Sequence, residues 1–134
     1  MREHSQLQLK QKLMAKGFLF ADIEPVLMHL AAQNWQSDSR FAQSYSRYRV
    51  NKGYGEVFIR YQLTQKGVAS AIINNALAEI DVDWFGLLTQ VYQKKYGNTP
   101  IFSRQEQIKR QRFLMQRGFT GELITRLLSR LAND

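Results

Sequence analysis

The sequence predicts an all-α protein made of three tandem three-helix repeats, the third of them shortened to two helices. Apolar residues recur at helical spacing throughout the chain, and no segment shows sustained apolar and polar alternation bounded by hairpin turns. A pattern of about fifty residues also occurs three times, with a glycine at the same offset in each copy: Gly17, Gly67 and Gly118. Because a unit of this size buries its apolar face by stacking on the next unit, we expect an elongated, right-angled helical stack.

The glycine of each repeat is expected to end a helix. Glycine adopts the left-handed backbone conformation at little steric cost, which suits the first position after a helix. The residue before it is basic in every copy and favours the negative end of the helix dipole, and the residue after it is apolar and can fold back on the last turn. These flanking residues are Lys16 and Phe18, Lys66 and Val68, and Arg117 and Phe119.

The helix before each glycine has start signals and a short apolar stripe. Ser5 with Gln8, and Ser103 with Glu106, fit the capping box, in which a serine oxygen and a longer side chain satisfy two backbone N–H groups. In the second repeat a glycine-containing loop, residues 53–55, precedes an acid in the first helical turn. Pairs of apolar residues make the stripe: Leu9 and Leu13, Ile59 and Leu63, and Ile108 and Met115.

The helix after each glycine is the clearest, because its apolar residues follow the spacing i, i+3, i+4, i+7. They are Ile23, Val26, Leu27 and Leu30; Ile73, Ala76, Leu77 and Ile80; and Ile124, Leu127, Leu128 and Leu131. A third helix is expected in the first two repeats, one with core aromatics and one with an apolar stripe. These residues are Phe41, Tyr45 and Tyr48, and Trp84, Leu87, Leu88 and Val91. Gly53 and Gly97 are placed to end these helices, which gives repeats at residues 1–52, 53–97 and 98–134.

The residue types that support catalysis or metal binding are scarce. The chain has no cysteine, and its two histidines, His4 and His29, are far apart and outside any zinc-binding motif. Neither a phosphate-binding P-loop nor a dinucleotide fingerprint is present. We therefore expect a protein that is not an enzyme, with no catalytic residue, metal or cofactor. No apolar stretch is long enough to cross a bilayer, so a cytoplasmic protein without a membrane partner is expected.

The positive charge is concentrated at the two ends of the chain. Of a formal net charge of +8, residues 1–52 carry eight basic and four acidic residues, residues 53–97 four of each, and residues 98–134 seven and three. Basic residues interleaved with aromatic ones suit a polyanion such as single-stranded DNA, because cations meet phosphates and rings stack on unpaired bases. The candidate contact residues are Arg40, Arg47, Arg49, Lys52, Arg104, Lys109, Arg110 and Arg112.

Several short motifs, taken together, resemble the RecX family of recombination regulators. The most specific is Lys52-Gly-Tyr-Gly55, combined with the three basic-glycine-apolar junctions. Further matching elements are Arg40-Phe-Ala42, Tyr45, Arg49, Ile59, Leu63, Gln65-Lys-Gly-Val68, Trp84, Lys95-Tyr-Gly97, Arg112-Phe-Leu114 and Arg117-Gly-Phe119. The resemblance covers essentially the whole chain. Members usually carry a further apolar helix before the stretch that begins here at Arg2, so it also implies a chain trimmed at its start.

The resemblance implies a non-enzymatic regulator that binds RecA and the RecA nucleoprotein filament. Such a regulator inhibits recombinase, ATPase and co-protease activity, and acts in DNA recombination, DNA repair and the SOS response. Single-stranded DNA is a further expected partner, and a monomer is the expected state. The resemblance also implies a stack of tandem three-helix units lying along the filament or blocking its growth.

Two other functions fit the same residues. A helix, glycine turn, helix arrangement is also typical of a helix-turn-helix regulator that acts directly on DNA. The start of the first candidate recognition helix, Leu19, Phe20 and Ala21, offers few polar groups for reading bases, which argues against this alternative. A protein adaptor with no nucleic-acid role is the third possibility, and it predicts binding that barely responds to salt.

Overall fold

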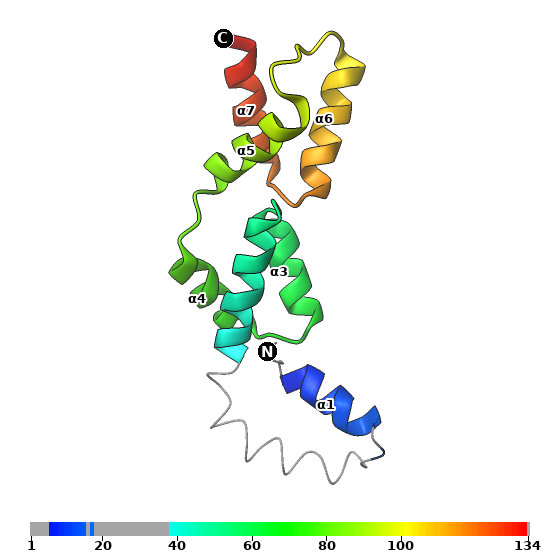
Figure 1. The fold of residues 1–134 in the computed structure, drawn as a ribbon, viewed down its shortest axis with the longest axis vertical. Helices are drawn as coiled ribbons and strands as arrows, with labels where there is room; N and C mark the ends of the chain where they lie inside the picture. Colours follow the sequence, from blue (N-terminus) through cyan, green and yellow to red (C-terminus); the bar gives the residue numbers. More distant parts are fainter. Residues whose placement is uncertain (1–5, 16, 18–37, 134) are drawn as a thin grey trace. The chain divides into compact units, whose positions relative to one another are not determined.

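The computed structural model describes residues 6–15, 17 and 38–133, and within these ranges every regular element is a helix (Figure 1). One helix occupies residues 38–51. The others are α1 (Gln6–Ala15), α3 (Glu56–Gln65), α4 (Ser70–Ile80), α5 (Trp84–Tyr96), α6 (Arg104–Gln116) and α7 (Gly121–Asn133). The all-α prediction is confirmed. The chain divides into two compact units, one of Met1–Arg47 with Tyr61–Asp81 and the other of Tyr48–Arg60 with Val82–Asp134.

The repeated glycines end helices in the way that the sequence predicts. Gly67 and Gly118 have φ angles of +84° and +96°, in the left-handed region. The N–H of Val68 donates to the carbonyl of Leu63 at 3.1 Å, and the N–H of Phe119 donates to the carbonyl five residues before it at 3.3 Å. This is the hydrogen-bond pattern of a Schellman stop, and the apolar residue after each glycine is buried, so the prediction is confirmed.

Each unit has its own apolar core. In the first unit, the buried residues come from helix 38–51, the second half of α3, the turn after it and α4. They are Phe41, Ala42, Tyr45, Leu63, Val68, Ile72, Ile73, Ala76 and Leu77. In the second unit, α7 packs against both α5 and α6 (Figure 1). The core residues there are Leu88, Tyr92, Leu114, Phe119, Ile124, Leu127 and Leu128. The predicted apolar stripe of α7 therefore faces the core at Ile124, Leu127 and Leu128, whereas its last member, Leu131, is 37% exposed.

Predicted core positions on two helices are wrong. The sequence places Tyr48 beside Phe41 and Tyr45, but its side chain is 54% exposed, because the buried face of helix 38–51 ends before its last turn. Ile108 and Met115, the predicted buried stripe of α6, are 42% and 60% exposed. The expectations for Ser5, Lys16, Phe18, His4, His29 and the helix containing Ile23, Val26, Leu27 and Leu30 lie outside the described residues.

The turn between α6 and α7 meets the start of α3 through main-chain atoms. The N–H of Gly55 donates to the carbonyl of Arg117, and the N–H of Val57 donates to the carbonyl of Gly118, both at 2.8 Å. N–H groups at a helix start and carbonyls at a helix end have no partner in their own helix. Each end therefore satisfies the other, and both glycines are needed because their backbones approach so closely.

Arg110 holds the 97–103 loop against α5 and α6. The residue is 1% exposed, and its guanidinium donates to four oxygens: Glu106 Oε1 at 3.0 Å, Tyr92 Oη at 2.6 Å, and the carbonyls of Thr99 at 2.9 Å and Pro100 at 3.1 Å. Burial lowers the pKa of the guanidinium, but the hydrogen bonds to Glu106 and Tyr92 outweigh it, and the pKa of Arg110 is raised.

Of the capping box predicted at the start of α6, only the hydrogen bond to the serine side chain forms. The Ser103 hydroxyl accepts a hydrogen bond from the N–H of Glu106 at 3.1 Å and caps the helix. The Glu106 carboxylate is engaged by Arg110 at 3.0 Å instead of reaching back along the chain. The buried guanidinium is the stronger partner because the contact joins opposite charges.

The same cluster makes stability sensitive to alkaline pH. Burial is the main cause that raises the pKa of the Tyr96 hydroxyl above its ordinary value of 10.0, with Arg110 opposing it and Glu106 adding to it. The folded state therefore favours the neutral phenol. This stabilisation is complete below about pH 10 and is lost as the pH rises through the higher folded pKa. We expect Tyr96→Phe to flatten the alkaline fall in thermal midpoint relative to the unmodified chain, and equal slopes would contradict this.

Candidate functional site

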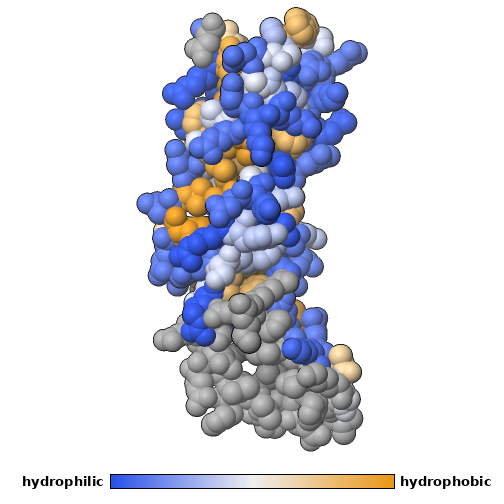
Figure 2. Space-filling view, in the orientation of Figure 1, coloured by the Kyte–Doolittle hydropathy of each residue, from blue (hydrophilic) through white to orange (hydrophobic). Residues whose placement is uncertain are grey.

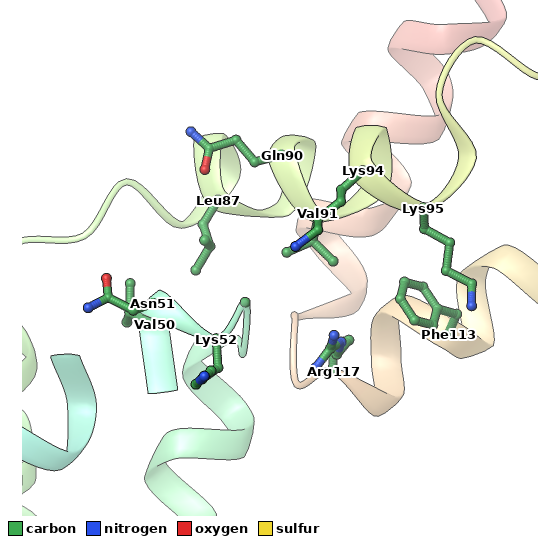
Figure 3. A pocket seen from close by; sticks show the side chains of 11 residues that line it. Val50, Asn51, Lys52, Leu87, Gln90, Val91, Lys94, Lys95, Phe113 and Arg117 are labelled. Atoms are coloured by element: carbon green, nitrogen blue, oxygen red, sulfur yellow. The ribbon is translucent and has the colours of Figure 1, made fainter. Parts of the chain in front are cut away.

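A pocket of about 730 Å³ in the second unit gathers positive charge (Figure 3). We call it the basic pocket. Its walls come from the end of helix 38–51, from α5 and from the C-terminal part of α6. The lining residues are Val50, Asn51, Lys52, Gly53, Leu87, Gln90, Val91, Lys94, Lys95, Phe113 and Arg117. Four of them are cations and none is acidic.

The cations of the basic pocket have no carboxylate partner among the residues that the structure describes. Within the described ranges, no ion pair involves Lys52, Lys94, Lys95 or Arg117. Three of them contact aromatic rings: Lys95 Nζ lies 4.6 Å from the ring centre of Phe113, the Arg117 guanidinium 4.7 Å from that of Tyr54, and Lys52 Nζ 5.7 Å from that of Tyr48. Such contacts orient a cation without neutralising it. The pocket therefore presents about four uncompensated positive charges to a ligand.

Apolar side chains lie between the cations of the basic pocket, together with the amides of Asn51 and Gln90. Figure 3 shows Leu87 extending from α5 toward Val50 and Asn51, and Lys95 running down toward Phe113. An aromatic ring framed by cations, that of Phe113, suits a ligand with anionic groups and flat bases, such as a nucleic-acid strand. The Arg117 guanidinium can also form a two-pronged contact with a phosphate, which an ammonium group cannot.

The structure places the first four predicted contact residues, Arg40 to Lys52, in different surroundings. Arg40 and Arg47 lie exposed on helix 38–51 in the first unit, where Arg47 donates to Gln43 at 3.5 Å. Lys52 lines the basic pocket. The Arg49 guanidinium is half-buried in the second unit, 5.3 Å from the ring centre of Tyr54.

The second predicted group lies on α6 and is also divided. Arg104, Lys109 and Arg112 are exposed. Arg110 is buried and occupied by four intramolecular acceptors, so in this structure it cannot reach a phosphate. Arg110 was predicted to contact a partner, but in the structure it holds the loop. It lies four residues before the buried Leu114, so helix spacing puts it on the buried side of α6.

Sequence reasoning missed three cations of the basic pocket. Lys94 and Lys95 belong to residues 53–97, a segment with no net charge. The sequence around Arg117 indicates only a helix stop. One signal was available, because Lys94 and Lys95 both stand at one end of α5, away from the acids of their segment. Their convergence with Lys52 depends on packing between helices and is not visible in the sequence.

A metal centre and a membrane-spanning helix are both absent from the described part of the chain. No group of three or more histidine, aspartate or glutamate residues there is placed to hold a metal ion. None of the helices within the described ranges is long and apolar enough to cross a membrane.

Comparison with known families identifies the helical units. The profile for the RecX second three-helix domain matches residues 37–77, and the profile for the RecX third three-helix domain matches residues 81–128. Together the two ranges cover about two thirds of the chain. This chain belongs to the RecX family. The matched ranges group helix 38–51 with α3 and α4, and α5 with α6 and α7, while the repeat boundaries at 52 and 97 remain a prediction.

Individual RecX proteins are similar over most of their length. Regulatory protein RecX of Vibrio vulnificus is 39% identical over 128 residues, which are 96% of this chain and 84% of that protein. The Pseudomonas entomophila protein of the same name is 39% identical, with coverages of 96% and 83%.

Two solved structures share the fold. A crystal structure of regulatory protein RecX has a TM-score of 0.75 and 27% identity, covering 91% of this chain and 62% of that chain. The chain therefore spans less than two thirds of that RecX protein's length. The crystal structure of RecX from Lactobacillus salivarius has a TM-score of 0.79 and 21% identity, covering 99% and 88% respectively.

Proposed function

We propose that this chain binds RecA and the RecA–DNA filament and inhibits the recombinase, ATPase and co-protease activities of that filament. Membership of a family of regulatory proteins supports this proposal, together with a basic pocket whose four cations lack carboxylate partners in the described residues. The chain acts by binding alone, as a monomer in the cytoplasm, and takes part in DNA recombination, repair and the SOS response.

The basic pocket supplies the DNA contact in this proposal. The four cations of the basic pocket, Lys95 included, meet the phosphates of a DNA strand in the filament, and each contact releases a condensed counterion. The half-buried ring of Phe113 lies beside these cations and offers an apolar surface to the strand. A protein that makes such contacts occupies positions on the filament where RecA subunits would otherwise be added or would hydrolyse ATP.

The direct test is the DNA-dependent ATP hydrolysis of RecA. We expect the chain, at a concentration well below that of RecA, to slow ATP hydrolysis and strand exchange, because binding along or at the end of a filament affects many subunits. Unchanged ATP hydrolysis and strand exchange would refute the proposal.

Charge reversal in the basic pocket is expected to weaken both DNA binding and inhibition. Lys94→Glu with Lys95→Glu should reduce the slope of log affinity for oligothymidylate against log salt by about 1.4, from about 0.7 for each lost phosphate contact. We expect the concentration needed for half-inhibition of RecA to rise about tenfold, equivalent to about 1.4 kcal/mol. Fluorescence anisotropy at several salt concentrations measures the first quantity, and ATPase assays measure the second.

A matched variant separates this effect from net charge. Arg126→Glu with Arg130→Glu removes the same charge from exposed positions on α7, outside the basic pocket. These two guanidinium groups lie 4.2 Å and 5.4 Å from the ring centre of Phe85. We expect this variant to inhibit RecA nearly as well as the unmodified chain. Equal losses in the two variants would show that the pocket has no specific part in binding.

The composition of α4 disfavours a helix-turn-helix regulator acting directly on DNA. α4 follows the Gly67 turn, where a recognition helix would lie, but it contains no lysine or arginine. A recognition helix needs long polar side chains to reach base edges in the major groove. Much tighter binding to one duplex sequence than to random DNA would nevertheless favour this alternative.

A further inference from the structure

The solvent-facing side of α6 is a second surface, distinct from the basic pocket. Its exposed residues are Arg104, Gln105, Ile108, Lys109, Arg112, Met115 and Gln116, which we call the outer face of α6. At 100° per residue they occupy a continuous arc of about 140°. Phe113 and Arg117, which line the basic pocket, lie outside this arc, so one helix carries two separate surfaces.

The outer face is positive and has no acid of its own. The only carboxylate of α6, that of Glu106, is turned toward the buried guanidinium of Arg110 at 3.0 Å. The buried arginine thus removes the negative charge from the exposed side of the helix. Within the described residues, no ion pair involves Arg104, Lys109 or Arg112.

Two aliphatic side chains lie within this positive face. Ile108 and Met115 are 42% and 60% exposed, and helix spacing puts both between Arg104 and Arg112. The side of the molecule drawn in Figure 2 is largely hydrophilic, with a group of hydrophobic residues near its middle. Exposed aliphatic residues grouped within a basic helix face mark a candidate interaction surface.

The chemistry of this face favours a protein over a nucleic acid. Aliphatic side chains cannot stack on bases, whereas methionine and arginine are enriched at protein interfaces, where apolar groups are buried inside a polar rim. The three cations complement an acidic surface, which would steer association and fix its orientation. α6 is about 20 Å long, enough to cover one such surface with a single helix face.

We propose that the outer face of α6 docks on an acidic protein surface with apolar side chains on RecA itself, while the basic pocket contacts DNA. This inference rests on the proposed function and deepens it by assigning protein and nucleic acid to different surfaces. The two contacts are thermodynamically linked in the filament, because one molecule makes both at once and the second contact is intramolecular.

A crossover experiment tests the assignment. The apolar variant is Ile108→Ser with Met115→Ser, and the pocket variant is Lys94→Glu with Lys95→Glu. Each is titrated with RecA alone, without DNA, and separately with oligothymidylate. We expect the apolar variant to lose about tenfold in affinity for RecA and to bind oligothymidylate as before, since a few buried apolar side chains dominate an interface. The pocket variant should show the opposite pattern.

Matched controls identify the alternatives. Gln105→Ser with Gln116→Ser changes the same face without removing an aliphatic group and should retain RecA affinity. Circular dichroism should show unchanged helix content, because all four substituted α6 positions are exposed.

Equal loss of oligothymidylate binding in the apolar variant would assign the face to DNA. Loss of a self-associated state of the chain in sedimentation would assign it to a second copy. Either result would overturn the inference.

Failure of the inference and failure of the proposed function give different results. If the unmodified chain inhibits RecA but the apolar variant binds RecA equally well, the function stands and the docking assignment falls. If the unmodified chain neither binds nor inhibits RecA, both fall.

Discussion

Replacing Gly118 with alanine is expected to lower the free energy of unfolding by about 3 kcal/mol or more, the sum of left-handed strain and overpacking. The φ angle of Gly118 is +96°, which costs an alanine about 1–2 kcal/mol. A Cβ at this position would also lie 2.6 Å from the main-chain nitrogen of Phe58. Since that atom belongs to the backbone at the start of α3, no side-chain rotation can relieve the contact. Urea denaturation followed by circular dichroism measures the loss.

Two other glycines separate the two causes. Gly17 has a φ angle of +93°, and a Cβ added there would have no atom of the described residues within 4 Å. Gly17→Ala therefore tests left-handed strain and should cost about 1–2 kcal/mol. Gly55 has no positive φ, but its Cβ would lie 2.5 Å from the carbonyl carbon of Gly118, so Gly55→Ala tests the close approach alone. If Gly118→Ala cost no more than Gly17→Ala, the main-chain contact with α3 would not be tight in solution.

Replacing Arg110 with methionine is expected to cost about 3 kcal/mol, because the change breaks a buried charge contact and leaves several acceptors without a donor. The acceptors are the Tyr92 hydroxyl, the Glu106 carboxylate and the carbonyls of Thr99 and Pro100. The expected cost is at the low end for a buried pair because the Glu106 side chain is 32% exposed and water can solvate it. Thermal and urea unfolding measure the difference.

Arg112→Met is the matched control, since it makes the same change two residues along the helix at an exposed position. It should alter stability by at most about 0.5 kcal/mol. Arg110→Lys keeps the charge but offers one ammonium group in place of a planar fork, and we expect an intermediate loss. Equal stabilities of Arg110→Met and Arg112→Met would mean that the loop is held without the guanidinium.

The helices and their ends were predictable because they depend on residues within one or two turns. The sequence around Gly67 and Gly118 predicts a helix stop with an apolar residue folded back, and the 6→1 hydrogen bonds at both places confirm it. Apolar spacing predicted the buried face of α7 for the same reason, since Ile124, Leu127 and Leu128 lie within two turns of one another.

Prediction failed where the deciding partners are distant in sequence. On α6 the apolar residues Ile108 and Met115 indicated the wrong face, because Arg110 occupies the buried side next to Leu114. A buried arginine is tolerated there only because Tyr92 and the loop carbonyls supply oxygens from 10 to 18 positions away.

The sequence by itself determined an all-helical chain, the positions of its glycine stops and the RecX resemblance, since propensity, spacing and local hydrogen bonds are written in neighbouring residues. Only the tertiary structure decided which cations line a pocket and which are buried. Packing brings Lys52, Lys94 and Arg117 around one pocket and removes Arg110 from the surface. Coulomb interactions depend on distance in space, and separation along the chain does not reveal that distance.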